Sequence, residues 1–288
     1  MTRNPSRNAL LVLAAASLLA ACSAQPEKTT KAAPAPSEPA ATAPKPDMGI
    51  EWVRTAAEYR AEAMQAYNAA TEDLQDMIAN KNWSALPSQA ESGTNRYDTK
   101  PPAAIFDIDE TVVDNVEFQA QLVPPFSEAK FDAWHEANVV PAVPGATAFV
   151  ERAREAGVEI FFVTNRSCHP PPGSSDPCPQ KRITLDDLRE AGIPFQPENV
   201  LLSDEHPGWT QEKEVRRNAI AAKYRVIMLF GDDLGDFLTC VRKRVYEPCT
   251  QAATRASRKA AIDKYANYWG QGWYILPNPM YGSWTSVE

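Results

Sequence analysis

Residues 103–115 read AAIFDIDETVVDN, and the rest of the chain is organised around this stretch. Its apolar start, residues 103–106, does not alternate with polar side chains, which is typical of a strand covered on both faces in a parallel sheet. Asp107 and Asp109 follow at positions i and i+2, so both carboxylates leave such a strand on the same side and can address one ligand. Because two like charges that close repel each other, the pair indicates a bound metal ion.

Two other readings of this acidic stretch compete with a reaction centre. A calcium loop of the EF-hand type needs Gly at its sixth position and a carboxylate at its twelfth, where Val112 and Phe118 stand. The calcium loop is therefore excluded. A solvated acidic turn after a strand stays open for an isolated Asp-x-Asp, and the rest of the chain has to decide.

The N-terminus predicts export. Arg3 and Arg7 precede an apolar segment, residues 9–19, which is too short for a mature membrane span and is typical of a secretory signal peptide. The small residues that lead to Cys22 resemble a bacterial lipobox, in which the cysteine is acylated and becomes the new N-terminus. Ser23 resembles a signal for sorting to the outer membrane. We therefore expect residues 1–22 to be a lipoprotein signal peptide and the protein to be anchored in the outer membrane through Cys22, on the periplasmic or cell-surface face.

A linker and one large domain follow. Residues 23–47 consist mainly of Ala, Pro, Lys, Glu, Thr and Ser without large apolar side chains, so we expect a disordered tether. Residues 48–288 have the size of one large domain with an inserted cap, or of two small domains. Residues 48–80 have a helical composition and carry one packing face. That face comprises Trp52, Ala56, Tyr59, Ala63, Ala66, Tyr67, Ala70 and Leu74.

Apolar strands alternate with helices in the domain. After residues 103–106, strands are predicted at 158–163, 200–202 and 226–230, and helices at 146–156, 184–192 and 213–224, the second capped by Thr184 with Asp187. This order predicts an α/β fold, a parallel sheet with helices on both faces. The segment at about 116–143 interrupts the alternation and is expected to form a small helical cap over the active site.

Polar clusters follow the predicted strands. They are Asp107 with Asp109, Thr164 with Asn165, Lys213 before a helix, and Asp232 with Asp236. Parallel sheets bind ligands at the carboxyl ends of their strands, so the fold would bring these groups to one edge. Carboxylates that hold a hard cation, an ammonium group and hydroxyl or amide donors together suit a phosphoryl group. A carboxylate there can attack phosphorus and form an aspartyl-phosphate.

With these motifs the chain resembles the haloacid dehalogenase superfamily and, more closely, the class C acid phosphatases, which are bacterial outer-membrane lipoproteins. The resemblance extends from about residue 49 to residue 284. The motifs that carry it are DIDETVVDN at 107–115, FVTNR at 162–166, Lys213 with Glu214, Arg216 and Arg217, GDDLGDF at 231–237, and PNPMYG at 277–282 with Trp284.

The resemblance implies a role for each carboxylate. Asp107 would be the nucleophile, and Asp109 the general acid that protonates the leaving oxygen and later the base that activates water. A metal ion, Mg²⁺, would be held by Asp107, the backbone carbonyl of Asp109, and Asp232. Asp236 would orient Lys213 or a metal-bound water.

The resemblance also implies how the phosphoryl group is bound. Thr164 and Asn165 would donate hydrogen bonds to its oxygens, and Lys213 would neutralise developing charge. In the family an aromatic clamp grips a flat ring such as a nucleobase. Trp134 and Tyr281 resemble that clamp, so nucleoside monophosphates and other small organic phosphates are the expected substrates, although either ring could instead be ordinary core. The net charge of −8 argues against nucleic-acid polymers as partners.

The chain departs from the family pattern in a few places. Val113, Phe118 and Asp233 stand where the family usually has Leu, Tyr and Asn. The loop from Cys168 to Cys178 is longer than the family's usual connection and lies just after Asn165, which puts substrate preference in doubt more than activity.

Four cysteines remain after Cys22, and three pairings are possible. An exported domain favours disulfides, and proximity favours Cys168 with Cys178 and Cys240 with Cys249. A zinc site using Cys168, His169 and Cys178 is an alternative. All three histidines of the chain, His135, His169 and His206, lack an evident triad partner and are expected on the surface or in loops, and no Gly-x-Ser-x-Gly elbow is present.

These observations predict a metal-dependent phosphomonoesterase that works through an aspartyl-phosphate. One alternative is a phosphotransferase that passes the same phosphoryl group to an alcohol. Another is a surface binding lipoprotein whose site is vestigial. The intact Asp107 and Asp109 speak against the vestigial site, because drift would remove the nucleophile or the acid first.

Overall fold

The computed structural model describes residues 47–91 and 96–287. The predicted signal peptide, Cys22 and all of the predicted tether except Asp47 lie outside the described residues, and Asp47 caps the first helix by accepting hydrogen bonds from the backbone N–H groups of Gly49 and Ile50. Among the described helices, none is long and apolar enough to cross a membrane.

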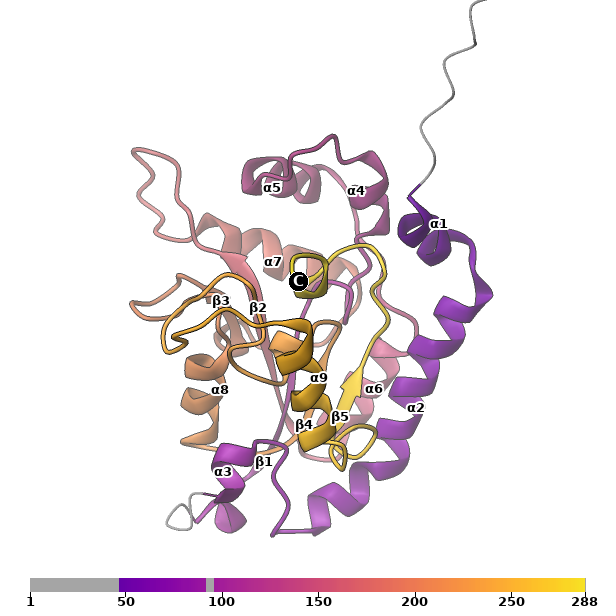
Figure 1. The fold of residues 1–288 in the computed structure, drawn as a ribbon, viewed down its shortest axis with the longest axis vertical. Helices are drawn as coiled ribbons and strands as arrows, with labels where there is room; N and C mark the ends of the chain where they lie inside the picture. Colours follow the sequence, from indigo (N-terminus) through magenta and orange to yellow (C-terminus); the bar gives the residue numbers. More distant parts are fainter. Residues whose placement is uncertain (1–46, 92–95, 288) are drawn as a thin grey trace, which may run out of the picture. The chain divides into compact units, whose positions relative to one another are not determined.

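Five parallel strands form one sheet in the order β3-β2-β1-β4-β5 (Figure 1). The strands are β1 Pro102–Phe106, β2 Glu159–Ser167, β3 Val200–Ser203, β4 Arg225–Gly231 and β5 Trp273–Ile275. The chain runs outward from β1 to β3 and then returns to β4 on the other side of β1. A sheet of this kind binds ligands where the strand order reverses, which here lies between β1 and β4.

Helices cover both faces of the sheet, as the uninterrupted apolar strands require. The helices are α1 Met48–Thr55, α2 Ala57–Ala79, α3 Pro87–Glu91, α4 Val116–Gln121, α5 Glu128–Ala137, α6 Ala146–Glu155, α7 Pro179–Glu190, α8 Glu214–Ala221 and α9 Arg255–Lys264. Ala104 and Phe106 of β1 pack with α2, α6 and α7, whereas Ala103 and Ile105 pack with α8 and α9. The α/β fold predicted from the sequence is confirmed.

The predicted helix at 48–80 is two helices. Ala56 has an extended backbone (φ −77°, ψ 128°) and separates α1 from α2. Helix propensity alone would carry the helix through an alanine. The break lets α1 pack beside α4, where Arg54 Nε lies 3.0 Å from a carboxylate oxygen of Glu117, while α2 buries Tyr59, Ala63, Tyr67, Ala70 and Leu74.

Other elements also differ from the prediction. Helix α7 begins at Pro179, not at Thr184, because proline suits a first helical turn; Thr184 lies inside the helix and its hydroxyl donates to the Gln180 carbonyl. Strand β2 continues through the predicted site residues to Ser167. Strand β5 and helix α9 were not predicted, since three residues are too few to show a strand pattern and α9 buries no side chain completely.

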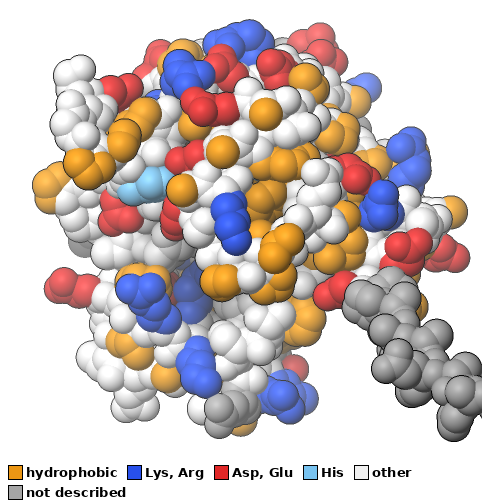
Figure 2. Space-filling model, turned by 90° about the horizontal axis from the view of Figure 1, so that it is seen from above, with side chains coloured by type: hydrophobic (Ala, Val, Ile, Leu, Met, Phe, Trp, Pro, Cys, Tyr) orange, Lys and Arg blue, Asp and Glu red, His pale blue; other side chains and the backbone are white. Residues whose placement is uncertain are grey.

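Helices α4 and α5 occupy the segment predicted as the cap and lie beyond the carboxyl ends of the strands (Figure 1). Seen from this end, acidic and basic side chains are interspersed and hydrophobic ones gather among them (Figure 2). This face therefore shows no extended area of a single charge sign.

Candidate active site

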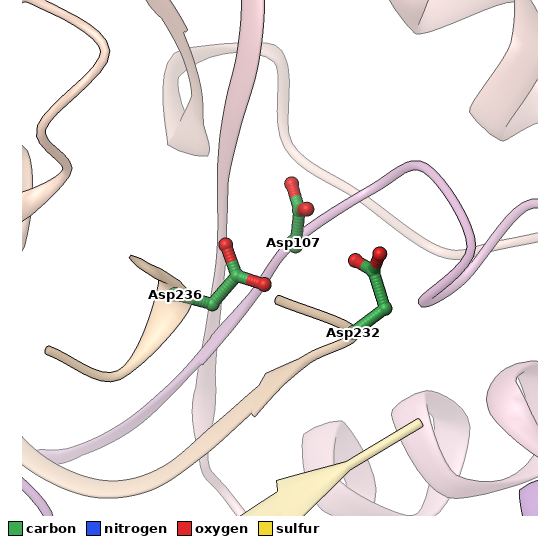
Figure 3. Close-up of side chains that lie close together, drawn as sticks. All are labelled: Asp107, Asp232 and Asp236. Atoms are coloured by element: carbon green, nitrogen blue, oxygen red, sulfur yellow. The ribbon is translucent and has the colours of Figure 1, made fainter. Parts of the chain in front are cut away.

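Three carboxylates meet where β1 and β4 end. The backbone N–H of Asp107 donates to the carbonyl of Phe230 at 2.9 Å, which ties the two strand ends together. Asp232 directly follows β4, and Asp236 ends a 3₁₀ turn at Leu234–Asp236. One carboxylate oxygen from each of Asp107, Asp232 and Asp236 lies within 4.8 Å of the other two (Figure 3).

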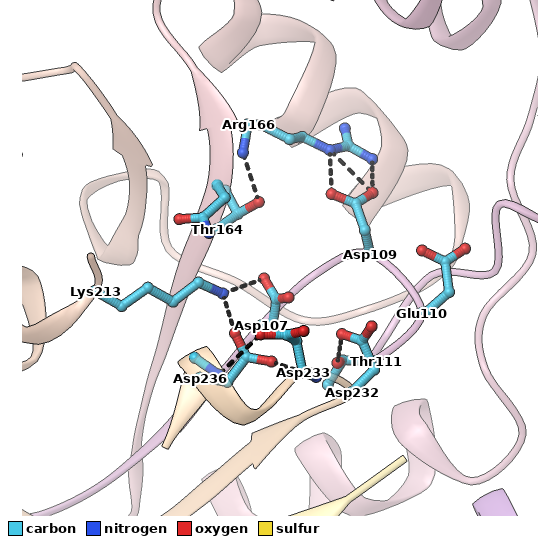
Figure 4. A network of polar contacts seen from close by, with 12 residues as sticks. Asp107, Asp109, Glu110, Thr111, Thr164, Arg166, Lys213, Asp232, Asp233 and Asp236 are labelled. Atoms are coloured by element: carbon cyan, nitrogen blue, oxygen red, sulfur yellow. Dashed lines mark hydrogen bonds and ion pairs between the residues drawn. The ribbon is translucent and has the colours of Figure 1, made fainter. Parts of the chain in front are cut away.

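Lys213 supplies one cation to this cluster. Its Nζ lies 2.7 Å from Asp107 Oδ1 and 2.6 Å from Asp236 Oδ1 (Figure 4). Asp236 approaches the end of β4 so closely that a Cβ on Gly231 would lie 2.2 Å from its Oδ2. Only glycine therefore fits at position 231 with this placement of Asp236.

The cluster keeps an excess of negative charge. Burial raises the pKa of Asp107 to about 7 and Lys213 opposes that rise, while Asp236 and Asp109 add to it. Burial and the nearby Asp236 and Asp107 carboxylates raise the pKa of Asp232 well above its usual range. Three clustered carboxylates with one ammonium group beside them fit a divalent cation with oxygen ligands, such as Mg²⁺.

The cluster contains one carboxylate that was not in the predicted metal set. The prediction joined Asp107 and Asp232 with the backbone carbonyl of Asp109, which stays a prediction, and the structure adds the carboxylate of Asp236 beside the first two. The carboxylate of Asp109 is engaged elsewhere. Asn278 Nδ2 donates to Asp232 Oδ2 at 2.8 Å, and so a residue from the C-terminal segment holds the second carboxylate in place.

Asp109 pairs with Arg166 at the end of β2 (Figure 4). Arg166 Nη2 donates to Asp109 Oδ1 at 2.7 Å, and Asn115 Nδ2 donates to the same oxygen at 2.7 Å. Burial alone would raise the pKa of Asp109, but the Arg166 guanidinium overcomes it and lowers the pKa below its usual range. The two predicted catalytic carboxylates thus have different cations, Lys213 for Asp107 and Arg166 for Asp109.

The prediction that His135 lies on the surface or in a loop is wrong. His135 is buried in α5, and its Nδ1 lies 2.7 Å from Asp187 Oδ2 in α7. His169 lies in a loop as predicted, with its Nε2 2.9 Å from Asp132 Oδ2, and His206 is exposed. Asp187 was predicted as a capping residue, and its contact with His135 was not predicted.

Both predicted disulfides are present, Cys168–Cys178 and Cys240–Cys249. The first of them removes the thiolates that the alternative zinc site required. The second disulfide is linked to Glu212, the residue before Lys213. The Glu212 carboxylate accepts a hydrogen bond from the backbone N–H of Cys240 at 3.2 Å.

Thr164 and Asn165 are fixed by a residue that sequence reasoning left without a role. Arg216 is fully buried, and its guanidinium donates to the Thr164 carbonyl and, at 3.0 Å, to Asn165 Oδ1. Because the amide oxygen of Asn165 is taken, its NH₂ group is the part left to donate to a ligand. Arg216 comes three residues after Lys213, at the start of α8, and this spacing could have indicated that it faces the same site.

The two predicted clamp residues have different surroundings. The Tyr281 hydroxyl donates to the carboxylate of Glu110, which is 2% exposed. Trp134 packs edge-on against Phe118 and His135. Among the described residues no ring contact joins Trp134 to Tyr281, so a clamp between them stays a prediction. The buried Glu110, with a left-handed backbone (φ 55°), was not predicted as part of the site.

Comparisons with known proteins agree with this geometry. The family model described as HAD superfamily, subfamily IIIB (Acid phosphatase) matches residues 13–284. A class C acid phosphatase from Bacillus anthracis has a similar structure, with 28% identity, a TM-score of 0.61, and coverage of 82% of this chain and 85% of that chain. A structure of the class C acid phosphatase from the same organism with tungstate bound has 28% identity, the same coverage and a TM-score of 0.62.

Proposed function

Since the chain belongs to the acid phosphatases of HAD subfamily IIIB and is therefore a phosphoric monoester hydrolase, we propose that it is a Mg²⁺-dependent phosphatase that forms an aspartyl-phosphate on Asp107. The observation that carries the proposal is the place of Asp107, at the end of β1, within the three-carboxylate cluster and 2.7 Å from Lys213 Nζ. Phosphoryl transfer needs this combination of positioning and charge.

In the first step, a carboxylate oxygen of Asp107 bonds to phosphorus as the ester P–O bond breaks. The leaving oxygen takes a proton from Asp109 and departs as an alcohol. In the second step, Asp109 accepts a proton from water, the water oxygen bonds to phosphorus, and the P–O bond to Asp107 breaks to release phosphate.

The other site residues bind and balance charge. Lys213, Thr164 and Asn165 donate to phosphoryl oxygens, with Asn165 held by Arg216. The carboxylates of Asp107, Asp232 and Asp236 would hold the metal ion, with the backbone carbonyl of Asp109 as a further proposed ligand. When bound, Mg²⁺ neutralises charge on the phosphoryl oxygens.

The test compares phosphate release by the wild type and Asp107→Asn, with and without Mg²⁺, on 4-nitrophenyl phosphate. We expect metal-dependent turnover in the wild type and its loss in the variant. Asp76→Asn, an isosteric change on the exposed side of α2, is the matched control. Turnover by Asp107→Asn at the wild-type rate would exclude the covalent mechanism, and product analysis with an added alcohol would reveal phosphotransfer.

Nucleoside monophosphates are the proposed substrates, because Trp134 and Tyr281 resemble the aromatic clamp of the family. Replacing Tyr281 by Phe keeps the ring and removes its bond to Glu110. We expect Tyr281→Ala, but not Tyr281→Phe, to raise KM for nucleotides relative to glycerol 2-phosphate. Equal KM changes on both substrates would exclude base recognition by this ring.

We also propose that Cys22 carries the lipid anchor and that the protein belongs to the outer membrane. Support comes from the apolar segment 9–19 followed by small residues before Cys22. The test is metabolic labelling with a fatty acid and membrane fractionation of cells that express the full chain. Cys22→Ser should lose both the label and the membrane association, and a labelled Cys22→Ser variant would refute the anchor.

A further inference from the structure

A row of buried side chains connects the cap to Asp109. Arg166 Nη1 donates to Asp187 Oδ2, and His135 Nδ1 donates to the same oxygen at 2.7 Å. The exposed fractions of these three side chains are 5%, 2% and 0%. Four elements thus contribute to one row, α5 with His135, α7 with Asp187, the end of β2 with Arg166, and the segment after β1 with Asp109.

This row fixes the plane of the Arg166 guanidinium. Asp109 binds its Nε and Nη2 edge, and Asp187 binds Nη1. The ring of Phe131 lies against the group, with its centroid 5.1 Å from the guanidinium carbon. A planar guanidinium that is bound by two carboxylates and packed against an aromatic ring has little freedom to turn.

The two carboxylate oxygens of Asp109 have different hydrogen bonds. Oδ1 accepts from Arg166 Nη2 and from Asn115 Nδ2, each at 2.7 Å, whereas Oδ2 has a longer contact of 3.1 Å with Arg166 Nε. Oδ2 is therefore the oxygen that is freer to carry a proton to a ligand.

We infer that Asp187 and His135 are positioning residues, which hold Arg166 so that Asp109 presents Oδ2 to the leaving oxygen. The inference rests on the proposed role of Asp109 as general acid. Misplacement of a reacting group by about 1 Å costs up to about 100-fold in rate, so loosening the row should slow proton transfer.

Two substrates with different leaving groups can distinguish this positioning role from a merely structural one. The oxygen of 4-nitrophenyl phosphate departs readily without a proton, whereas the alkoxide of glycerol 2-phosphate needs one. General acid catalysis contributes about 10²–10⁴-fold where a proton is needed. The ratio of kcat/KM for the two substrates reports this step, because kcat/KM covers cleavage of the ester bond.

Asp187→Asn is the first variant, since it keeps the size of the side chain and removes its charge. We expect kcat/KM on glycerol 2-phosphate to fall about tenfold or more relative to 4-nitrophenyl phosphate. Asp186→Asn, the neighbouring residue on the same helix, is the matched control, because Asp186 pairs at the surface with Arg182 and Arg189. Equal losses on both substrates, or none, in a folded Asp187→Asn would overturn the inference.

The His135 position gives a second, independent test that holds if Asp187→Asn does not fold. Asparagine can place an N–H where His135 has Nδ1, so His135→Asn should keep the substrate ratio and His135→Ala should shift it. If His135→Asn and His135→Ala had the same ratio of kcat/KM for the two substrates, the inference would be contradicted. Asp109→Asn is measured alongside: if it fails to discriminate against glycerol 2-phosphate, the proposed acid role fails; if it discriminates and the row variants do not, only the positioning role fails.

Discussion

The side-chain nitrogen of Lys213 lies 2.7 Å from a carboxylate oxygen of Asp107, and only 2% of the lysine side chain is exposed. A buried ammonium at this distance opposes the rise that burial causes in the pKa of Asp107. The same group stands ready to neutralise charge on a phosphoryl group that is bonded to Asp107.

Lys213→Met should therefore reduce kcat strongly. Loss of one preorganised donor to a developing charge costs about 10²–10³-fold in kcat, and we expect a loss of this size on 4-nitrophenyl phosphate. Lys223→Met, at an exposed lysine just beyond α8, is the control and should keep wild-type kcat. A Lys213→Met variant that turns over within a factor of a few of the wild type would remove Lys213 from the mechanism.

The central part of the site could be predicted because its residues follow strands directly. The uninterrupted apolar runs of β1 and β4 show buried parallel strands, and such strands end at one edge, which brings Asp107 and Asp232 together. The spacing of two residues between Asp107 and Asp109 also led to the prediction that both carboxylates point to the same side. Spacing could not reveal that Asp107 would pair with Lys213 and Asp109 with Arg166.

The supporting residues escaped prediction because their partners are distant in the sequence. Asp187 is 52 residues from His135 and 21 from Arg166, and neither interval is a helix or strand spacing. The break at Ala56 is likewise absent from the local sequence pattern, and it accompanies the packing of α1 beside α4. Local periodicity predicts which face of an element is buried, and only the tertiary fold decides which polar groups meet there.

Mg²⁺ should stabilise the folded protein measurably. Three carboxylates lie close together and Lys213 pairs with only two of them, so a bound cation relieves their repulsion in the folded state alone. At a free concentration of about 100 times its Kd, a ligand adds about 2.7 kcal/mol to the free energy of unfolding. We expect Tm to rise with MgCl₂ in the wild type and to stay constant in Asp232→Asn, as measured by calorimetry. Equal rises in both proteins would place the bound Mg²⁺ elsewhere.

Phe106, the last residue of β1, should contribute strongly to the stability of the fold because of how its ring is packed. Its ring is fully buried and stacks on Phe230, with centroids 4.3 Å apart and planes 5° apart. Phe106→Ala should lower the free energy of unfolding by about 3–5 kcal/mol in urea denaturation. Phe126→Ala, at an aromatic that is 53% exposed, is the control and should cost much less. A cost below about 1 kcal/mol for Phe106→Ala would contradict the packing described for this strand.

The two disulfides should differ in their effect on catalysis although they close loops of nearly equal length, with separations of 10 and 9 residues. Replacing either pair by serines should lower the free energy of unfolding by about 2–3 kcal/mol, since loop closure depends on length. Only Cys240–Cys249 anchors Glu212, the neighbour of Lys213 in the chain. The double variant Cys240→Ser, Cys249→Ser should therefore also lose kcat on 4-nitrophenyl phosphate, whereas Cys168→Ser, Cys178→Ser should keep it. If the second variant lost as much kcat as the first, or the first lost none, the contact between Cys240 and Glu212 would have no part in holding Lys213.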